Sequence, residues 1–240
     1  MEQEKIVTIQ DVTQEIYVVF DTFNQEFFYG DLPAAALTIQ STLHKKRTMG
    51  WCTRNPVWSF ENGENQLYEI NLSAEFLDQG FYETMDTLLH EMVHLYFQYH
   101  EIQDVSRKGQ YHNKRFKEKV LELGYIYTTT KPDPYVGWGA PRIGDKLKER
   151  IAALDINQNV FRLARYGSTY LQLVEDGTDA VDAKAMVEFE SLSAKSKSGS
   201  IKYTCPGCHL IIRSYKKDIE ISCNQCDRNF ISEGEYKKLQ

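Results

Sequence analysis

The stretch LLHEMVHLYFQYH, from Leu88 to His100, constrains the fold of this chain more than any other segment. Its residues are apolar on nearly all sides, which predicts a buried helix. His90 and His94 are four residues apart, so they project from one face of that helix about one turn apart. Burying two imidazoles and the intervening Glu91 costs free energy unless other groups satisfy them. We therefore expect a core helix that carries a polar site.

The spacing of His90 and His94 lets both imidazoles bind one zinc ion, at about 2.0–2.1 Å each. Glu91 follows the first histidine, where its carboxylate can reach a water molecule at the metal without being a ligand. This arrangement is the H-E-x-x-H pattern of zinc hydrolases, with two ligands and one general base. A satisfied core histidine would explain one of these polar groups, but not all three at this spacing. We predict a catalytic zinc site with Glu91 as the base.

The third zinc ligand is not fixed by this pattern. His100 has the spacing of the longer H-E-x-x-H-x-x-G-x-x-H motif, in which a glycine lets the chain turn back to the metal. Phe97 occupies the glycine position here, and in a continuing helix His100 points about 120° away from His94. We therefore predict that His100 is a surface or helix-end histidine and not a ligand.

A better candidate for the third ligand is His112, which comes just before a second predicted helix. That helix covers about 113–123 and ends at Gly124. A junction between a loop and a helix can aim a side chain back at the first helix. From the residues alone, a carboxylate of Glu118 or Glu122 remains the alternative ligand.

Four of the five cysteines are predicted to bind a second zinc ion. YTCPGC and ISCNQC give the pattern C-x₂-C-x₁₄-C-x₂-C, whose two pairs of thiolates form a closed tetrahedral site. A unit this small buries little apolar surface, so zinc is expected to supply most of its folding free energy. The isolated Cys52 is predicted to be a small buried core residue. The predicted structural ligands are Cys205, Cys208, Cys223 and Cys226.

Residue periodicity predicts an α+β fold around the histidine helix. An amphipathic helix is expected from Asp11, as the N-cap, to Phe28, with a stop at Gly30. Breakers in KPDPYVGWGAP predict a loop at 131–141. Strands are expected at LTIQST, MGWCT and LYEINLS, a short helix at 145–154, and strand-like runs at VFRLARY and TYLQLV.

The chain is long enough for one sizeable core and a smaller appended unit. The predicted parts are a catalytic domain at 1–131, an extension at 132–176, a flexible linker at 177–200 and a zinc ribbon at 201–240. The amino terminus has no signal-like segment, and no apolar run could span a bilayer. We therefore expect a cytoplasmic protein with reduced thiols and no membrane partner. The net charge of −6 argues against a nucleic-acid coat over the whole molecule, but allows a local basic patch.

Several segments resemble the SprT-like metalloproteases, a family that includes the Spartan-type proteases of DNA–protein crosslinks. The resemblance rests on DTLLHEMVHLYFQYH, on the G-x-x-H-x-x-x-F setting of His112, and on FDTFNQEFFYGDLP, MGWCT and INLSAEFL further upstream. It covers about Thr8 to Tyr125, and a C-terminal cysteine ribbon is also common in bacterial members.

The resemblance implies a zincin-like catalytic domain beside a small β-sheet, in which His90, His94 and His112 bind zinc. It also implies that Glu91 is the catalytic base and that His100 is not a ligand. The implied activity is zinc-dependent hydrolysis of peptide bonds in protein substrates that are DNA-bound or crosslinked, as in DNA repair. Candidates for stabilising the oxyanion are Tyr111, Tyr125 and the aromatics of PYVGW.

A basic run between the cysteine pairs is a candidate contact with nucleic acid. Its cations could meet a phosphate backbone while its aromatic ring stacks on a base, although a solvated hairpin tip fits equally well. The run at 44–47, HKKR, has the same ambiguity. The candidate residues in the ribbon are Arg213, Tyr215, Lys216 and Lys217.

Two other functions stay open from the sequence. One is a non-proteolytic zinc-binding adaptor for nucleic acid or protein, against which the intact Glu91 argues, since a purely structural site needs no base. The other is a general intracellular peptidase that acts without DNA.

Overall fold

The computed structural model describes residues 6–41, 48–193, 200–217 and 219–236. The chain divides into two compact units, Met1–Gly167 and Ser168–Gln240, and each is described by itself. The basic run at 44–47, and residues 194–199 of the predicted linker, lie outside the described residues. No helix within the described ranges is both long enough and apolar enough to cross a membrane.

The first unit begins with helix α1, Ile9–Phe28, whose regularly spaced apolar residues are buried. Its N-cap is Thr8, so the prediction of Asp11 as the cap is wrong. The Thr8 side chain accepts from the Asp11 backbone N–H, and the Asp11 carboxylate accepts from the Thr8 backbone N–H. This reciprocal capping box satisfies two backbone donors and lets the helix start before Asp11. The predicted stop is confirmed, because Tyr29 and Gly30 have φ of 57° and 76°.

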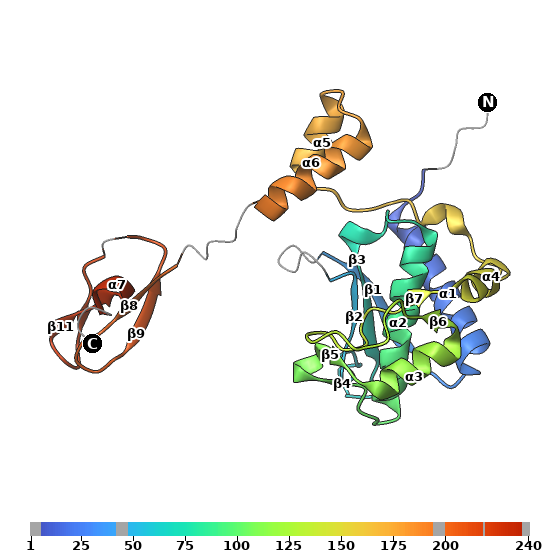
Figure 1. Ribbon diagram of the computed structural model, residues 1–240, viewed down its shortest axis with the longest axis horizontal. Helices are drawn as coiled ribbons and strands as arrows, with labels where there is room; N and C mark the ends of the chain where they lie inside the picture. Colours follow the sequence, from blue (N-terminus) through green and yellow to red (C-terminus); the bar gives the residue numbers. More distant parts are fainter. Residues whose placement is uncertain (1–5, 42–47, 194–199, 218, 237–240) are drawn as a thin grey trace. The chain divides into compact units, whose positions relative to one another are not determined.

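Three strands form a small mixed sheet in the first unit (Figure 1). Their order is β1-β3-β2, with β3 parallel to β1 and antiparallel to β2. Strand β3 is buried along almost its whole length, whereas β2 is a half-buried edge strand. All three lie where the periodicity predicts strands. Their bounds are Ala35–Gln40 for β1, Gly50–Cys52 for β2 and Tyr68–Ser73 for β3.

Helix α2, Phe81–Tyr99, carries the histidine motif and packs against β2 and β3. Helix α3, Lys114–Leu123, packs against α2 and buries Phe116 and Val120 in the same core. Its N-cap is Asn113, and Gly124 ends it with φ of 109°. Between the two helices lie the strand pair β4, Val105–Ser106, and β5, Tyr111–His112, and the turn η2, Arg107–Gly109. A further short turn, η1, Ala74–Phe76, follows β3.

The first unit continues beyond the predicted boundary at residue 131. Leu147, Ile151 and Phe161 are buried in the same core as α1 and α2, so this segment packs as part of the first unit. The prediction of a strand at VFRLARY is wrong. The end of the turn η3 and an irregular segment are found there, because the apolar residues of this run fill the core without pairing to another strand. The elements here are β6, Tyr125–Ile126; β7, Arg142–Ile143; α4, Asp145–Ala152; and η3, Gln158–Val160.

The second unit starts with two helices, α5, Ser168–Glu175, and α6, Ala180–Ser193, which pack against each other. TYLQLV therefore belongs to a helix and not to the predicted strand, since its short apolar run fits either periodicity. The prediction of a flexible linker at 177–200 is wrong for Ala180–Ser193, which form α6. This segment is helical because it packs against α5 and buries Ala183.

The four cysteines lie in the last part of the second unit. Cys223 ends β10 and Cys226 lies in the turn after it, while Cys205 and Cys208 follow β8. These strands belong to two small sheets, with strand orders β12-β8-β9 and β10-β11. Tyr203 and Phe230 join Cys205 and Cys223 in a small separate core. The elements are β8, Ile201–Thr204; β9, Ile211–Ser214; β10, Ser222–Cys223; β11, Arg228–Asn229; β12, Ile231–Ser232; and α7, Glu233–Tyr236.

Candidate metal centres

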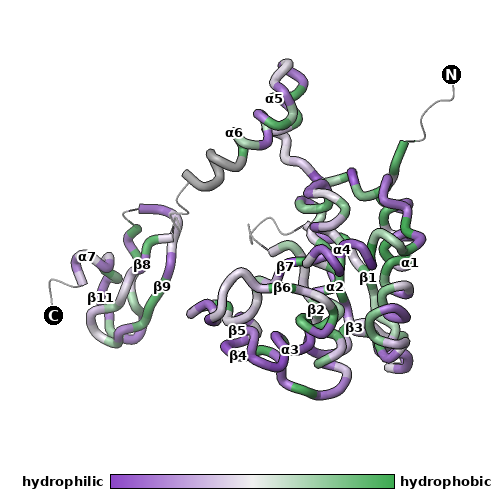
Figure 2. Tube along the Cα trace, turned by 45° about the vertical axis from the view of Figure 1, so that its right-hand side comes forward, coloured by the Kyte–Doolittle hydropathy of each residue, from purple (hydrophilic) through white to green (hydrophobic). Residues whose placement is uncertain are grey.

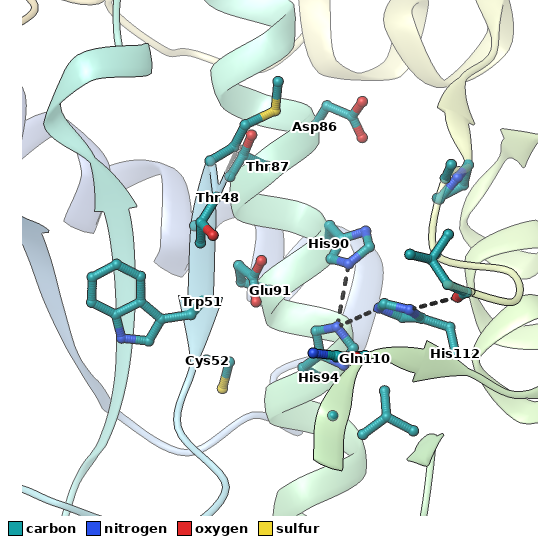
Figure 3. A pocket seen from close by; sticks show the side chains of 18 of the residues that line it. Thr48, Trp51, Cys52, Asp86, Thr87, His90, Glu91, His94, Gln110 and His112 are labelled. Atoms are coloured by element: carbon teal, nitrogen blue, oxygen red, sulfur yellow. Dashed lines mark hydrogen bonds between the residues drawn. The ribbon is translucent and has the colours of Figure 1, made fainter. Parts of the chain in front are cut away.

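Three imidazoles from two parts of the first unit meet at one point (Figure 3). His90 and His94 project from the same face of α2, and His112 reaches them from the end of β5. The Nε2 atom of His94 lies 3.2 Å from Nε2 of His90 and 3.1 Å from Nε2 of His112. In a tetrahedral site with zinc–nitrogen bonds of about 2.0–2.1 Å, two nitrogens are roughly 3.4 Å apart. The spacing of these donors therefore fits zinc.

The outer nitrogens of two of these rings are already engaged. His94 Nδ1 lies 2.5 Å from Oδ2 of Asp104, and His112 Nδ1 lies 3.2 Å from the carbonyl oxygen of Val136. A ring whose Nδ1–H donates outward has its lone pair on Nε2. The Nε2 lone pairs of His94 and His112 therefore point at each other, an arrangement that a cation between them would stabilise.

The electrostatics of the site keep two of the rings neutral near pH 7. Burial, with smaller contributions from the charges of His94 and His112, holds the pKa of His90 well below its usual value. Burial and the charge of His94 lower the pKa of His112 to about 4. Neutral imidazole is the form that binds a metal, so neither ring has to lose a proton first.

Glu91 lies on α2 beside the histidines, on the side that faces β2 (Figure 3). Its residue is 8% exposed, and the backbone N–H of Cys52 donates to its carboxylate. Burial raises its pKa to about 7, against the lowering effects of the His94 charge and of this hydrogen bond. A carboxyl group with a pKa near neutrality can both accept and release a proton, as a general base must.

An open cleft of about 610 Å³ gives access to these groups. Its walls include β2 with the preceding residues 48 and 49, one face of α2, and the loop 135–142. Cys52 is part of this wall: its half-buried side chain packs against the core and also lines the cleft, so its predicted place in a closed core is only partly right.

A model of the SprT-like family matches residues 16–135 of this chain. The chain belongs to the SprT-like family. No curated protein and no solved structure matches the chain. The matched range contains α1 from Ile16 onward, the three-stranded sheet and the three histidines of the site, and it makes this a metallopeptidase-like domain.

The SprT-like domain places the other predicted ligand candidates elsewhere. His100 caps the end of α2, where its Nε2 lies 2.7 Å from Oδ2 of Asp31. Glu118 and Glu122 are exposed on α3 and pair with lysines of the same helix, Lys114 and Lys119. Among the described residues, the group of close metal-binding atoms in this domain comprises only His90, His94 and His112.

The aromatic residues predicted as candidates for stabilising the oxyanion lie in different environments in the SprT-like domain. Tyr125 is buried, and its hydroxyl donates to the carbonyl oxygen of Asp86, so it is a core residue. The guanidinium of Arg107 lies over the Tyr111 ring, with its Cζ atom 4.5 Å from the centroid of that ring. Of these aromatic side chains, Tyr135 is the one that lines the cleft.

Two contacts in the SprT-like site were not predicted from the sequence. Asp104, 1% exposed, holds His94, and the loop after Asp133 lies against His112. The backbone of His112 also bonds to this loop: the Trp138 N–H donates to the His112 carbonyl oxygen, and the His112 N–H donates to the Val136 carbonyl oxygen. A Cβ atom on Gly139 would lie 2.4 Å from His112 Nδ1, so only glycine fits there. The sequence offers one weak indication of the Asp104 contact: an aspartate stands ten residues after the histidine ligand His94.

Replacing Asp104 by asparagine in this SprT-like domain is expected to weaken zinc binding about 10–100-fold, because second-layer carboxylates orient a histidine ligand and raise its basicity. The measurement is competition for zinc against a chromophoric chelator. Asp31→Asn is the matched control, since Asp31 contacts the non-ligand His100 in the same way. Equal zinc affinities of the two variants would show that Asp104 does not support the site.

The four cysteines form a second cluster, within 4.8 Å of one another. Cys208 Sγ lies 3.5 Å from Cys223 Sγ, near the roughly 3.8 Å expected for two thiolates on one tetrahedral zinc ion. A backbone N–H bond from Cys208, opposed by burial, helps to lower the pKa of the Cys205 thiol to about 7. The donor set and its closed arrangement fit a structural zinc site.

Proposed function

We propose that this chain is a zinc-dependent endopeptidase that cleaves extended polypeptide segments. The observation that carries the proposal is the edge strand β2, which runs along the cleft beside Glu91 and the histidines. Small-molecule hydrolases need no such strand. A peptide laid in the cleft can pair with it as an added strand and so pass the metal site in extended form.

The pairing pattern leaves one side of β2 available for a substrate. Met49 and Thr53 bond to β3, through Ser73 N–H to the Met49 carbonyl and Thr53 N–H to the Glu69 carbonyl. In an antiparallel pair the bonding direction alternates, so Gly50 and Cys52 direct their backbone groups to the opposite side. The Cys52 N–H donates to the Glu91 carboxylate, and among the described residues no strand pairs with Gly50 on that side, so its backbone groups can bond to a peptide.

In the proposed reaction, His90, His94 and His112 hold zinc, which supplies a Lewis acid that polarises the scissile carbonyl and acidifies water. Glu91 accepts the proton of the attacking water on its carboxylate and delivers it to the leaving amine. Its hydrogen bond from the Cys52 N–H orients the carboxylate toward the cleft. Asp104 holds the His94 ring in one orientation throughout.

We further propose that the substrates are DNA-bound or crosslinked proteins and that the ribbon contributes to recruiting them. Ile211 and Arg213 alternate along β9, an edge strand, and Tyr215 directly follows its end; all three are exposed. Tyr215 is 84% exposed, and Lys216 and Lys217 follow it. An exposed ring flanked by cations is suited to stack on a base while the cations meet phosphates.

The experiment compares three states of the full chain: zinc-loaded, chelated, and chelated with zinc restored. The substrates are one unfolded protein, free or crosslinked to single-stranded or double-stranded DNA. We expect cleavage in the two zinc-containing states and faster cleavage of the crosslinked protein. Cleavage at equal rates with and without DNA would favour a general peptidase. No cleavage by a folded chain that retains zinc would favour the adaptor.

A further inference from the structure

We infer that Trp138 is a positioning residue of the zinc site, because it anchors the loop that holds the third ligand. This loop, residues 133–139 with the sequence DPYVGWG, lies against His112. The inference rests on the zinc site of the proposed function. It is tested through metal binding and needs no proteolysis.

The backbone and the ring of His112 both bond to the 133–139 loop. The His112 N–H donates to the Val136 carbonyl oxygen at 3.0 Å, and the Trp138 N–H donates to the His112 carbonyl oxygen at 3.1 Å. The same Val136 oxygen lies 3.2 Å from Nδ1 of the His112 ring, a bond that Figure 3 shows on the side away from His94. These three bonds set the direction in which Nε2 of His112 points.

Glycines on either side of Trp138 permit this close approach. A Cβ atom on Gly137 would lie 2.2 Å from the His112 carbonyl oxygen, and one on Gly139 would lie 2.4 Å from His112 Nδ1. Both distances are far below van der Waals contact, so a side chain at either position would displace the loop from the ligand. Trp138, between the two glycines, therefore supplies the side chain that can hold the loop in place.

The Trp138 ring is packed between a cation and a second aromatic ring. Nζ of Lys117, a half-buried residue of α3, lies 3.7 Å from the Trp138 ring centroid. The Tyr127 ring meets Trp138 edge to face, with their centroids 5.1 Å apart, and the Tyr127 hydroxyl donates to the Trp138 carbonyl oxygen at 2.7 Å. Tryptophan is the aromatic residue that attracts a cation most strongly, so these contacts fasten the loop to α3 and to the chain after β6.

The ammonium of Lys117 is available to the Trp138 ring. Helix α3 is largely hydrophilic (Figure 2), and its two other lysines pair with glutamates of the same helix. Lys117 forms no ion pair with any residue that the structure describes. A carboxylate beside the ammonium would compete with the ring, so its absence favours the contact with Trp138.

The third ligand needs this support more than the other two. His90 and His94 belong to α2, whose neighbours in the core fix its position. His112 ends the two-residue strand β5, which pairs with β4 and, through the loop, with Gly137. A binding site requires its groups to be held to within about 0.5 Å, so a loop released from its anchor would let the His112 ring move too far for tight zinc binding.

The first measurement is the zinc affinity of the full chain, by competition against a chromophoric chelator. Trp138→Leu should weaken binding at the histidine site about 10-fold, as is typical when a partner of a metal ligand is removed. Trp138→Phe should restore the affinity to within about 3-fold of the wild type, since its ring still lies under Lys117. Leucine retains apolar volume without a ring, so recovery by phenylalanine identifies the ring contact.

Cobalt(II) in place of zinc reads the histidine site separately from the cysteine cluster. Thiolate ligands give intense charge-transfer absorption, whereas the visible bands of cobalt held by imidazoles report the geometry of that site. Trp138→Leu should change the visible bands of the histidine site and leave the charge-transfer absorption of the cysteine cluster unaltered. A general loss of packing would not select one site in this way.

The cation is tested by Lys117→Met, which removes the charge and keeps the length of a side chain at the surface, so the fold stays intact. Zinc binding should weaken about 3-fold. The matched control is Lys119→Met on the same helix, because Lys119 Nζ lies 4.5 Å from the ring centroid of Tyr96, a ring that packs on Phe28 of α1. The zinc affinity of the control should equal that of the wild type.

Wild-type zinc affinity in Trp138→Leu would overturn the inference. Equal losses in Trp138→Leu and Trp138→Phe, or in the two lysine variants, would overturn it as well. A wild-type chain that binds no zinc at the histidines would contradict the zinc site itself, and with it both this inference and the proposed function. Normal zinc binding without cleavage of any protein would contradict the proposed function alone.

Discussion

Glu91→Gln is expected to lower the rate of peptide-bond cleavage about 10²–10⁴-fold, while the zinc content of the chain stays that of the wild type. Glutamine has the shape of glutamate, and its side-chain oxygen can still accept the Cys52 N–H that holds the carboxylate in the native site. What glutamine cannot do is take a proton from water. The effect is measured as initial cleavage rates together with zinc per chain by atomic absorption.

The matched control for this variant is Glu118→Gln, which removes one carboxylate from the exposed surface of α3. That pair with Lys114 is solvent-exposed and contributes little, so activity and zinc content should both remain unchanged. Wild-type cleavage by Glu91→Gln would remove Glu91 from the mechanism. Loss of zinc together with activity would mean that the substitution disturbs the metal site, and not proton transfer alone.

His112→Ala is expected to reduce the zinc content from about two ions per chain to about one, because catalytic sites of this type need three protein ligands. The alanine also removes the ring that Phe116 contacts, at 4.5 Å between ring centroids, but the backbone of β5 keeps its bonds to Val136 and Trp138. The remaining ion is the one expected in the cysteine cluster. The measurement is zinc per chain after dialysis at a fixed free-zinc concentration.

His100→Ala is the matched control, because His100 is the histidine at the alternative motif spacing and lies at the end of the same helix. Its loss removes an exposed contact with Asp31 and should leave the zinc content at about two. A fall in the His100 variant, or full zinc content in the His112 variant, would contradict the ligand set proposed for the site.

Most helices and strands of the first unit can be predicted from the local spacing of apolar residues. The apolar spacing of α1, α2 and α3 and the alternation in β1 and β3 predict elements that the structure confirms, with small errors at their ends. The error at the start of α1 arises because Asp11 acts as the acidic partner in a capping box whose cap is Thr8. Both residues are common helix caps, and the sequence does not distinguish the two roles.

Prediction failed where long-range packing decides the structure. TYLQLV has apolar residues compatible with a strand or a helix, and its pairing with α6 selects the helix. Residues 132–167 contain many breakers and short apolar runs, so their membership of the first unit's core depends on contacts with α1 and α2. Such contacts leave no periodic signal in the segment itself.

The sequence by itself determined the chemistry that is local: two histidines and a glutamate on one helix, and two cysteine pairs at the spacing of a zinc ribbon. These are short-range patterns, because one helical turn or one tight knuckle sets their geometry. Only the tertiary structure decided how the site is completed. It brings His112 to the helix, buries Asp104 against His94, and lays β2 along the cleft. The physical reason is that each of these contacts joins segments distant in the chain, whose meeting depends on the packing of the whole core.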